Sequence, residues 1–308
     1  MAKIYQSATE LVGHTPLVNM QNLAKRHKIK ANILGKCEFF NPAFSVKDRV
    51  ALNMLEKVSF TKITPDTIFV EATSGNTGIG LASMCAAKGY KLVIIMPENV
   101  SKERIKLIRH FGAEVILTPK EEGMNGSVQK AKMLAEKNKN VILLNQFENP
   151  ANPEAHTLST AVELLDQTGT NIDALVCGVG TSGTLTGIAK ALKTCLPDLY
   201  VVAVEPKESQ VLNGQEAQNH GIAGIGANFT PPFFDPSLVD EIIPIASEEA
   251  VSMCKEVAKT EGLGVGISAG AAVLAAIELG KRPNMSKKNI VVILPDAIER
   301  YLSLSYFD

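Results

Sequence analysis

Short apolar runs alternate with longer amphipathic stretches along most of this chain. Residues 91–96 and 113–117 are runs rich in Val, Ile and Leu, and the stretch between them, 101–111, repeats its apolar positions at helical spacing. Apolar runs of this length predict buried strands, whereas the longer periodic stretch predicts a helix. The alternation predicts an α/β fold with parallel-rich, twisted sheets covered by helices. Further strands are expected at 67–70, 174–177 and 200–204.

Composition restricts the class of function. A chain of 308 residues with 45% hydrophobic content can form two domains, and its net charge of −1 gives no electrostatic reason to bind nucleic acid or an anionic membrane. The five cysteines are scattered, and the five histidines lack ligand spacing, so no metal site and no disulfide framework are expected. No apolar run approaches the roughly 20 residues of a membrane span, and we expect a cytoplasmic protein that acts on small molecules.

Lys47 is the first candidate for covalent chemistry. It lies in the segment NPAFSVKDR (residues 41–49), among small and apolar neighbours where a loop becomes a helix that Ser45 can cap. A free lysine has a pKa of about 10.4, but desolvation favours the neutral amine, which can form a Schiff base with a carbonyl. A solvent-exposed lysine at a helix start is the alternative.

Two polar turns that follow predicted strands are candidate anion sites. After the strand at 67–70 comes TSGNTG (residues 73–78), followed by the start of a predicted helix. Backbone N–H groups and the helix dipole favour a carboxylate or a phosphate at such a turn. The second turn, GVGTSGTLTG (residues 178–187), adds glycines that permit close backbone approach and hydroxyl donors.

The second turn also permits a different interpretation. Residues 178–183 match the dinucleotide-binding fingerprint, and Glu205 follows the next predicted strand, where an acid that binds a ribose is expected. A nicotinamide-dependent oxidoreductase is therefore an alternative from another class of enzyme. It gives no role to Lys47 or to the turn at 73–78.

Motifs spread over nearly the whole chain resemble one family. The chain is similar to the cysteine synthase (O-acetylserine sulfhydrylase) family of fold-type II pyridoxal-phosphate enzymes, which are tryptophan synthase β-like in fold. The matching segments are 13–17, 41–49, 73–80, 146–153, 178–187, 224–227, 266–272 and 299–303.

The resemblance implies a domain arrangement. It predicts a smaller mobile domain at 41–149, a larger cofactor-binding domain formed by 1–40 and 150–308, and an active site in the cleft between them. The two prolines and two asparagines of residues 149–153 suit a connection between domains. The resemblance also implies a homodimer that can bind the C-terminal tail of serine acetyltransferase.

The resemblance assigns roles to individual residues. Lys47 would bind pyridoxal 5'-phosphate covalently and then act as the base that removes the substrate α-proton. The other expected contacts are Gly180, Thr181, Ser182, Gly183 and Thr184 to the cofactor phosphate, Asn76 to its ring hydroxyl, Ser268 to its pyridine nitrogen, and Thr73, Ser74, Gly75, Thr77 and Gln146 to the substrate carboxylate.

Ser268 indicates the type of reaction. A neutral hydroxyl does not hold the pyridine nitrogen protonated as a carboxylate does, which favours β-elimination and replacement over chemistry that needs a long-lived carbanion. The implied reaction makes L-cysteine from O-acetyl-L-serine and sulfide through an α-aminoacrylate. Ser268 could also serve as the cap of a helix that starts near Gly270.

Some positions depart from the usual family pattern. Ala72, Ser182, Ala269 and the pair Ala297-Ile298 are expected to be tolerated, because the assigned contacts remain. Asn228 stands where glycine is usual, and with the segments 211–214 and 231–235 it is similar to cystathionine β-synthase type relatives. Replacement with homocysteine, release of sulfide from cysteine, and a catalytically silent binding subunit therefore stay open as alternatives, although the intact Lys47 argues against the silent subunit.

Overall fold

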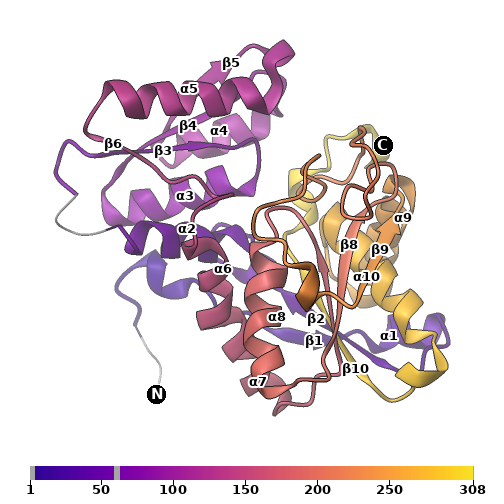
Figure 1. Cartoon of the computed structure of the whole chain (residues 1–308). Coiled ribbons are helices and arrows are strands. Elements are labelled where there is room, and N and C mark those ends of the chain that lie inside the picture. The colour runs from indigo at the N-terminus through magenta and orange to yellow at the C-terminus, as the bar shows by residue number, and fades with distance from the viewer. Residues whose placement is uncertain (1–3, 59–62, 308) are drawn as a thin grey trace. The chain divides into compact units, whose positions relative to one another are not determined.

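The computed structural model describes residues 4–58 and 63–307, which form two compact units (Figure 1). The first unit comprises residues 4–12 and 41–152, and the second comprises residues 13–40 and 153–307. Each unit is built on a sheet of its own, and in each sheet the connections between parallel strands contain helices. The described residues contain no helix that is long and apolar enough to cross a membrane.

Strands and helices alternate as the hydrophobic pattern predicts. The strands are β1 (Leu17–Asn19), β2 (Asn32–Cys37), β3 (Ile68–Ala72), β4 (Lys91–Pro97), β5 (Glu114–Thr118), β6 (Val141–Leu143), β7 (Ala174–Gly178), β8 (Tyr200–Pro206), β9 (Glu241–Ile245) and β10 (Asn289–Leu294). The α-helices are α1 (Gln21–Arg26), α2 (Lys47–Glu56), α3 (Asn76–Lys88), α4 (Lys102–His110), α5 (Gly123–Lys137), α6 (Ala151–Ala155), α7 (Ala161–Thr168), α8 (Gly183–Cys195), α9 (Ser247–Glu261) and α10 (Ile267–Gly280). Short helical turns used below are η1 (Ala8–Leu11), η2 (Glu38–Phe40), the π-helical turn η5 (His156–Thr160) and η8 (Ile298–Arg300).

The first unit contains a four-stranded parallel sheet in the order β5-β4-β3-β6. Successive strand residues face opposite sides. Phe69 and Ile94 lie in a core cluster with residues of α2, α3 and α4, whereas Val70 and Ile95 pack with residues of α5 on the other side. Both faces are covered by helices, so the strands read as continuous apolar runs in the sequence.

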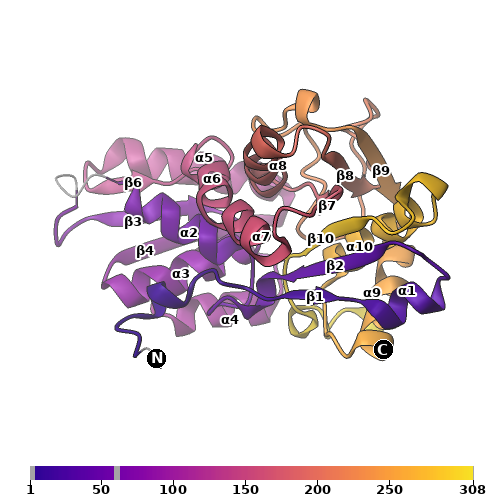
Figure 2. The same ribbon diagram turned by 90° about the horizontal axis from the view of Figure 1, so that it is seen from below.

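The second unit contains a six-stranded sheet in the order β1-β2-β10-β7-β8-β9, in which only the edge strand β1 is antiparallel. Val176 and Val292 belong to a core cluster with α1, α9 and α10. Leu175 and Val291 belong to the opposite cluster with α7 and α8. Figure 2 shows these two helical layers on either side of the sheet. The predicted α/β class with parallel-rich sheets is confirmed.

The N-terminal residues differ from the expected domain assignment. The resemblance placed residues 1–40 with the larger domain, whereas residues 4–12 group with 41–152. The physical reason is local packing, because η1 contacts α3 and Val12 packs against the core cluster of the first unit. The other boundary between the units falls between Asn152 and Pro153, where α6 continues through the sequence predicted to connect the domains.

Candidate active site

Lys47 is the first residue of α2 and is partly buried. Its backbone N–H donates to the hydroxyl of Ser45 at 3.3 Å, so Ser45 contributes to the helix start although Val46 holds the N-cap position. Asp48 and Arg49 are buried, at 0% and 3% exposure. The segment around Lys47 is therefore part of a packed interior rather than a surface loop.

The start of α3 packs closely against Lys47. A Cβ placed on Gly80 would lie 3.1 Å from the carbonyl oxygen of Lys47 and 3.3 Å from the backbone nitrogen of Asp48. Only glycine permits this close approach of the two helices without a shift. Gly80 lies one helical turn after Asn76, the first residue of α3, so the structure brings the candidate lysine beside the turn at 73–78.

The expected carboxylate-binding turn is held from several sides within the first unit. The Gly75 N–H donates to Thr73 Oγ1 at 3.2 Å, and the hydroxyl of Thr77 donates to Gln146 Oε1 at 2.6 Å. Arg104 of α4 donates from Nη1 to the carbonyl oxygen of Ser74 at 3.2 Å. All of these residues except Arg104 were predicted from the sequence. Arg104 belongs to no motif and lies in a surface helix, so no signal in the sequence marked it.

Glu71 supports Gln146 from the end of β3. The Gln146 N–H points at the Glu71 carboxyl, 3.3 Å from Oε2, and both residues are buried. Burial raises the pKa of Glu71 to about 8, although backbone hydrogen bonds from Gln146 and Asn145 oppose the shift. Sequence analysis passed over Glu71, because a single acid at a strand end looks like an ordinary polar boundary.

Gly75 has no side chain at a position where the fold leaves room for one. A Cβ built on Gly75 meets nothing within 4 Å, and its φ of −117° is accessible to any residue. Packing therefore does not require glycine here. Open space in front of a helix N-terminus, beside buried Thr73 and Thr77, fits a small anionic ligand.

The turn at 178–184 opens helix α8 in the second unit. The Gly183 N–H donates to Thr181 Oγ1 at 3.3 Å, and Ser182 holds the left-handed conformation with φ of 66°. The Thr184 hydroxyl lies 3.1 Å from His156 Nε2, and the ring of His156 is fully buried. The first N–H groups of a helix have no intrahelical partner, so this turn is suited to a phosphate.

Gly224 links this turn to Ser268. A Cβ on Gly180 would overlap the carbonyl oxygen of Gly224, and a Cβ on Gly224 would lie 3.9 Å from the hydroxyl of Ser268. Gly224 is exposed with φ of 94°, whereas Ser268 is 2% exposed. The structure thus brings Gly180, Gly224 and Ser268 together, and Gly224 is a site residue whose role sequence analysis did not assign.

Ser268 is not a helix cap. Helix α10 begins at Ile267 with Gly266 at the N-cap, so Ser268 is the second helical residue. The expectation of a helix that starts near Gly270 was wrong. Gly270 is instead a packing position, because its Cβ would overlap the carbonyl oxygen of Ala250 in α9. The hydroxyl of Ser268 is consequently not used to cap the helix.

The carboxylate of Glu205 does not remain available for a ribose. It accepts hydrogen bonds from the Leu212 N–H at 2.8 Å and from the Asn213 N–H and side-chain amide at 3.2 and 2.6 Å. Burial raises its pKa. Glu205 therefore holds the backbone at 212–213 in place, and the dinucleotide interpretation loses the acid on which it depended.

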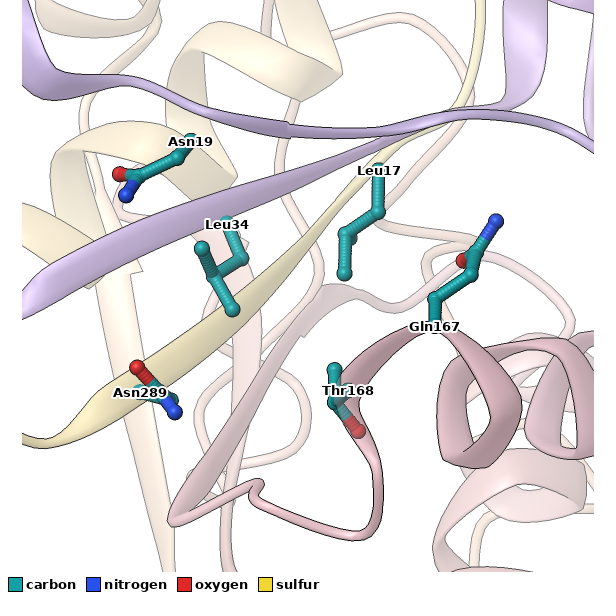
Figure 3. Close-up of a pocket in the computed structure, with 6 residues that line it drawn as sticks. All are labelled: Leu17, Asn19, Leu34, Gln167, Thr168 and Asn289. Atoms are coloured by element: carbon teal, nitrogen blue, oxygen red, sulfur yellow. The ribbon is translucent and has the colours of Figure 1, made fainter.

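A cavity of about 370 Å³ in the second unit lies away from the candidate residues. Figure 3 shows Leu17 and Leu34 beside it, with Gln167 and Thr168 from the end of α7. The Gln167 amide already bonds Thr15 O and Lys36 Nζ, and the Thr168 hydroxyl donates to Leu164 O. With these polar groups already occupied, the cavity offers little to recognise a polar ligand.

The sequence and the fold both match known proteins over nearly the whole chain. Residues 8–296 match the family described as pyridoxal-phosphate dependent enzymes. The chain is 47% identical over 303 residues to a cysteine synthase of Staphylococcus aureus, which covers 98% of this chain and 96% of the relative.

Solved structures give the same result. The cysteine synthase of Entamoeba histolytica aligns with a TM-score of 0.95 and 41% identity over 99% of this chain and 91% of its own. A hydrogen sulfide-producing enzyme of Fusobacterium nucleatum aligns with a TM-score of 0.92 and 40% identity over 97% of this chain and all of its own. This chain belongs to the family of pyridoxal-phosphate dependent enzymes.

Proposed function

We propose that this enzyme makes L-cysteine from O-acetyl-L-serine and sulfide by pyridoxal-phosphate dependent β-replacement. The observation that carries the proposal is the pairing of Lys47 with the turn at 73–78, held by the close contact at Gly80. The end-to-end similarity to a cysteine synthase supports the same reaction.

The residues present fit pyridoxal phosphate. The turn that opens α8 presents backbone N–H groups for a phosphate, and the buried hydroxyl of Ser268 lies behind exposed Gly224 near that turn. A neutral hydroxyl suits an unprotonated pyridine nitrogen. Bound pyridoxal phosphate supplies the electron sink that stabilises negative charge at the substrate α-carbon.

Lys47 performs two tasks in this proposal. Its amine would hold the cofactor by a covalent bond to the aldehyde carbon, made with loss of water, and would be freed when the substrate binds. The released Nζ takes the proton from the substrate α-carbon. Partial burial suits both tasks, because desolvation favours the neutral amine that each one needs.

The turn at 73–77 orients the substrate by its carboxylate. The backbone N–H groups at the start of α3, including that of Thr77, and the hydroxyl of Thr73 are the donors, and Asn76 would bind the ring hydroxyl of the cofactor. Gln146 holds the Thr77 side chain by the 2.6 Å hydrogen bond, and Glu71 holds Gln146 in turn. This chain of contacts fixes the donors before the substrate arrives, which reduces the entropy lost on binding.

Asn228 is the residue that bears most directly on the choice of substrate. It is exposed, has φ of 63°, and accepts a hydrogen bond from the Ser209 hydroxyl at 3.1 Å. Its left-handed backbone agrees with a plain loop asparagine, whereas its amide can also contact a leaving group or a nucleophile. Cystathionine β-synthase type replacement and sulfide release from cysteine are the alternatives that share the cofactor.

A panel of substrates tests the proposed function. The holoenzyme is assayed with O-acetylserine, serine and cysteine as first substrates, and with sulfide, homocysteine and water as second substrates. We expect kcat/KM to be highest for O-acetylserine with sulfide, and Asn228→Gly to change the ratios by about tenfold, since an unpaired polar group costs about 1–3 kcal/mol. Faster formation of cystathionine, or faster sulfide release, would overturn the assignment. Unchanged ratios in Asn228→Gly would make Asn228 a bystander.

Three further expectations belong to this proposal. A homodimer, a cytoplasmic location and docking of the C-terminal tail of serine acetyltransferase all follow from the resemblance. Size-exclusion chromatography with light scattering, run with and without a synthetic tail peptide, measures the oligomeric state and the binding of the peptide. A monomer would contradict the homodimer, and an unchanged elution and scattering profile with no peptide bound would contradict the docking.

A further inference from the structure

A buried carboxylate and a buried tyrosine lie beside the N-terminus of helix α10. The Tyr301 hydroxyl donates to Asp296 Oδ2 at 2.5 Å, and the two residues are 2% and 1% exposed. Neither residue belongs to the set that the family resemblance assigns to cofactor or substrate. A buried charge is costly unless it has partners, so its presence here calls for a physical role.

The segment that carries this pair is tied to the backbone that leads into α10. Gly266 N–H donates to the carbonyl oxygen of Asp296 at 2.9 Å, and Ile298 N–H donates to that of Gly264 at 3.0 Å. Val265 and Ala297 form an antiparallel bridge between these hydrogen bonds. Residues 264–266 are thereby fixed from one side.

The carboxylate itself lies against the N-cap of α10. A Cβ on Gly266 would overlap Asp296 Oδ1, and Gly266 is the N-cap residue. Ser268 follows two residues later, in the first turn of the helix. A negative charge at a helix N-terminus interacts favourably with the helix dipole, and it also acts on any group bound at that terminus.

Titratable groups from two neighbouring segments face Asp296. Tyr301 contacts it through the hydroxyl. From α9, the Cys254 thiol donates to the carbonyl oxygen of Val265 at 2.7 Å, and burial together with the charge of Asp296 raises the pKa of this thiol to about 12. Ala297 and Ile298 add no side-chain hydroxyl or charge at this position.

We propose that Asp296 and Tyr301 are positioning residues that fix the start of α10 and set the electrostatic field at Ser268. The inference rests on the proposed function, because it takes Ser268 as the partner of the pyridine nitrogen. Asp296 places a negative charge behind a neutral hydroxyl, and Tyr301 offsets part of that charge through its hydroxyl dipole. The pair thus tunes the cofactor nitrogen without touching it.

The test is a pH titration of the visible absorption band of the holoenzyme, recorded without substrate. Asp296→Asn keeps the shape and removes the charge, so the spectral midpoint should fall by about 0.5–1 pH unit. Tyr301→Phe removes the offsetting dipole, so the midpoint should move in the opposite direction. If the two midpoints shift in opposite directions, the cause is electrostatic. Loosening of the fold would instead shift the midpoints of both variants in the same direction.

Glu241→Gln is the matched control. Glu241 also accepts a tyrosine hydroxyl, from Tyr200 at 3.1 Å, but it lies at the first residue of β9, at the amino end of the strand. We expect this variant to keep the midpoint of the parent. The inference would be overturned if the midpoint of Asp296→Asn equalled that of the parent, or if Asp296→Asn and Glu241→Gln shifted the midpoint equally. In either case a visible absorption band in the parent would leave the proposed function intact. A parent without that band would overturn both.

Discussion

At the scale of single residues, left-handed backbone conformations occur at several non-glycine positions of the segments that resemble the family. Phe44, Ser182 and Asn228 have φ of 63°, 66° and 63°. Asparagine tolerates this region, whereas a bulky residue there is strained by about 1–2 kcal/mol. Sequence analysis singled out Ser182 and Asn228 as departures from the family pattern, and the left-handed backbone explains why glycine suits both positions. Phe44 gave no such signal, because its conformation depends on the turn that its N–H closes to Asn41 O.

Phe44→Gly is expected to stabilise the protein. The phenyl ring is 59% exposed, so its removal costs little packing, while glycine relieves the strain. Glycine also raises the entropy of the unfolded chain, which offsets part of the relieved strain. We therefore expect the free energy of unfolding to rise by about 0.5–1 kcal/mol and the melting temperature by about 1–3 °C.

Phe40→Gly is the control for that experiment. Phe40 is 61% exposed but packs against Phe39 in η2 and has no left-handed backbone. Differential scanning calorimetry should show a lower melting temperature for this variant. Equal destabilisation of both variants would contradict the account of strain at Phe44.

At the scale of elements, the strand-turn-helix units could be predicted from sequence, and their long-range supports could not. The turns at 73–78 and 178–184 follow β3 and β7 as the pattern indicated. Glu71 and Arg104 reach the candidate residues through contacts between elements distant in sequence, and each is a common residue type in an ordinary position. No local pattern distinguishes such residues, because their roles depend on which elements the fold brings together.

Glu71→Gln tests the support behind Gln146. Burial raises the pKa of Glu71 in the folded protein to about 8 from its ordinary value of 4.5. Between these pH values the Glu71 carboxyl is ionised in the unfolded chain but keeps its proton in the folded protein. The free energy of unfolding therefore falls as pH rises, and the loss levels off above pH 8. Glutamine removes this titration.

The stability advantage of Glu71→Gln over the parent should therefore grow between about pH 4.5 and 8. The full span corresponds to a free energy on the order of 5 kcal/mol. Urea unfolding at several pH values measures the difference, with Glu114→Gln, at an exposed residue of β5, as the control. A difference that does not change with pH would contradict the raised pKa.

At the scale of the whole molecule, the candidate set is divided between the two units. Lys47, the turn at 73–77 and Gln146 belong to the first unit, and the turn at 180–184 and Ser268 belong to the second. The fold class followed from the alternating pattern, because strands covered on both faces must be apolar throughout. The grouping of residues 4–12 with the first unit did not follow, since a short N-terminal segment can pack against either core.

The central claim is that Lys47 is the covalent attachment point of the cofactor. The most direct measurement is reduction of the holoenzyme with borohydride, followed by peptide mapping by mass spectrometry. We predict that the pyridoxyl phosphate mass appears on the peptide that contains Lys47, and that Lys47→Ala shows no such adduct while its far-ultraviolet circular dichroism matches that of the parent. An adduct on another lysine, or an unmodified Lys47 in an active enzyme, would contradict the account.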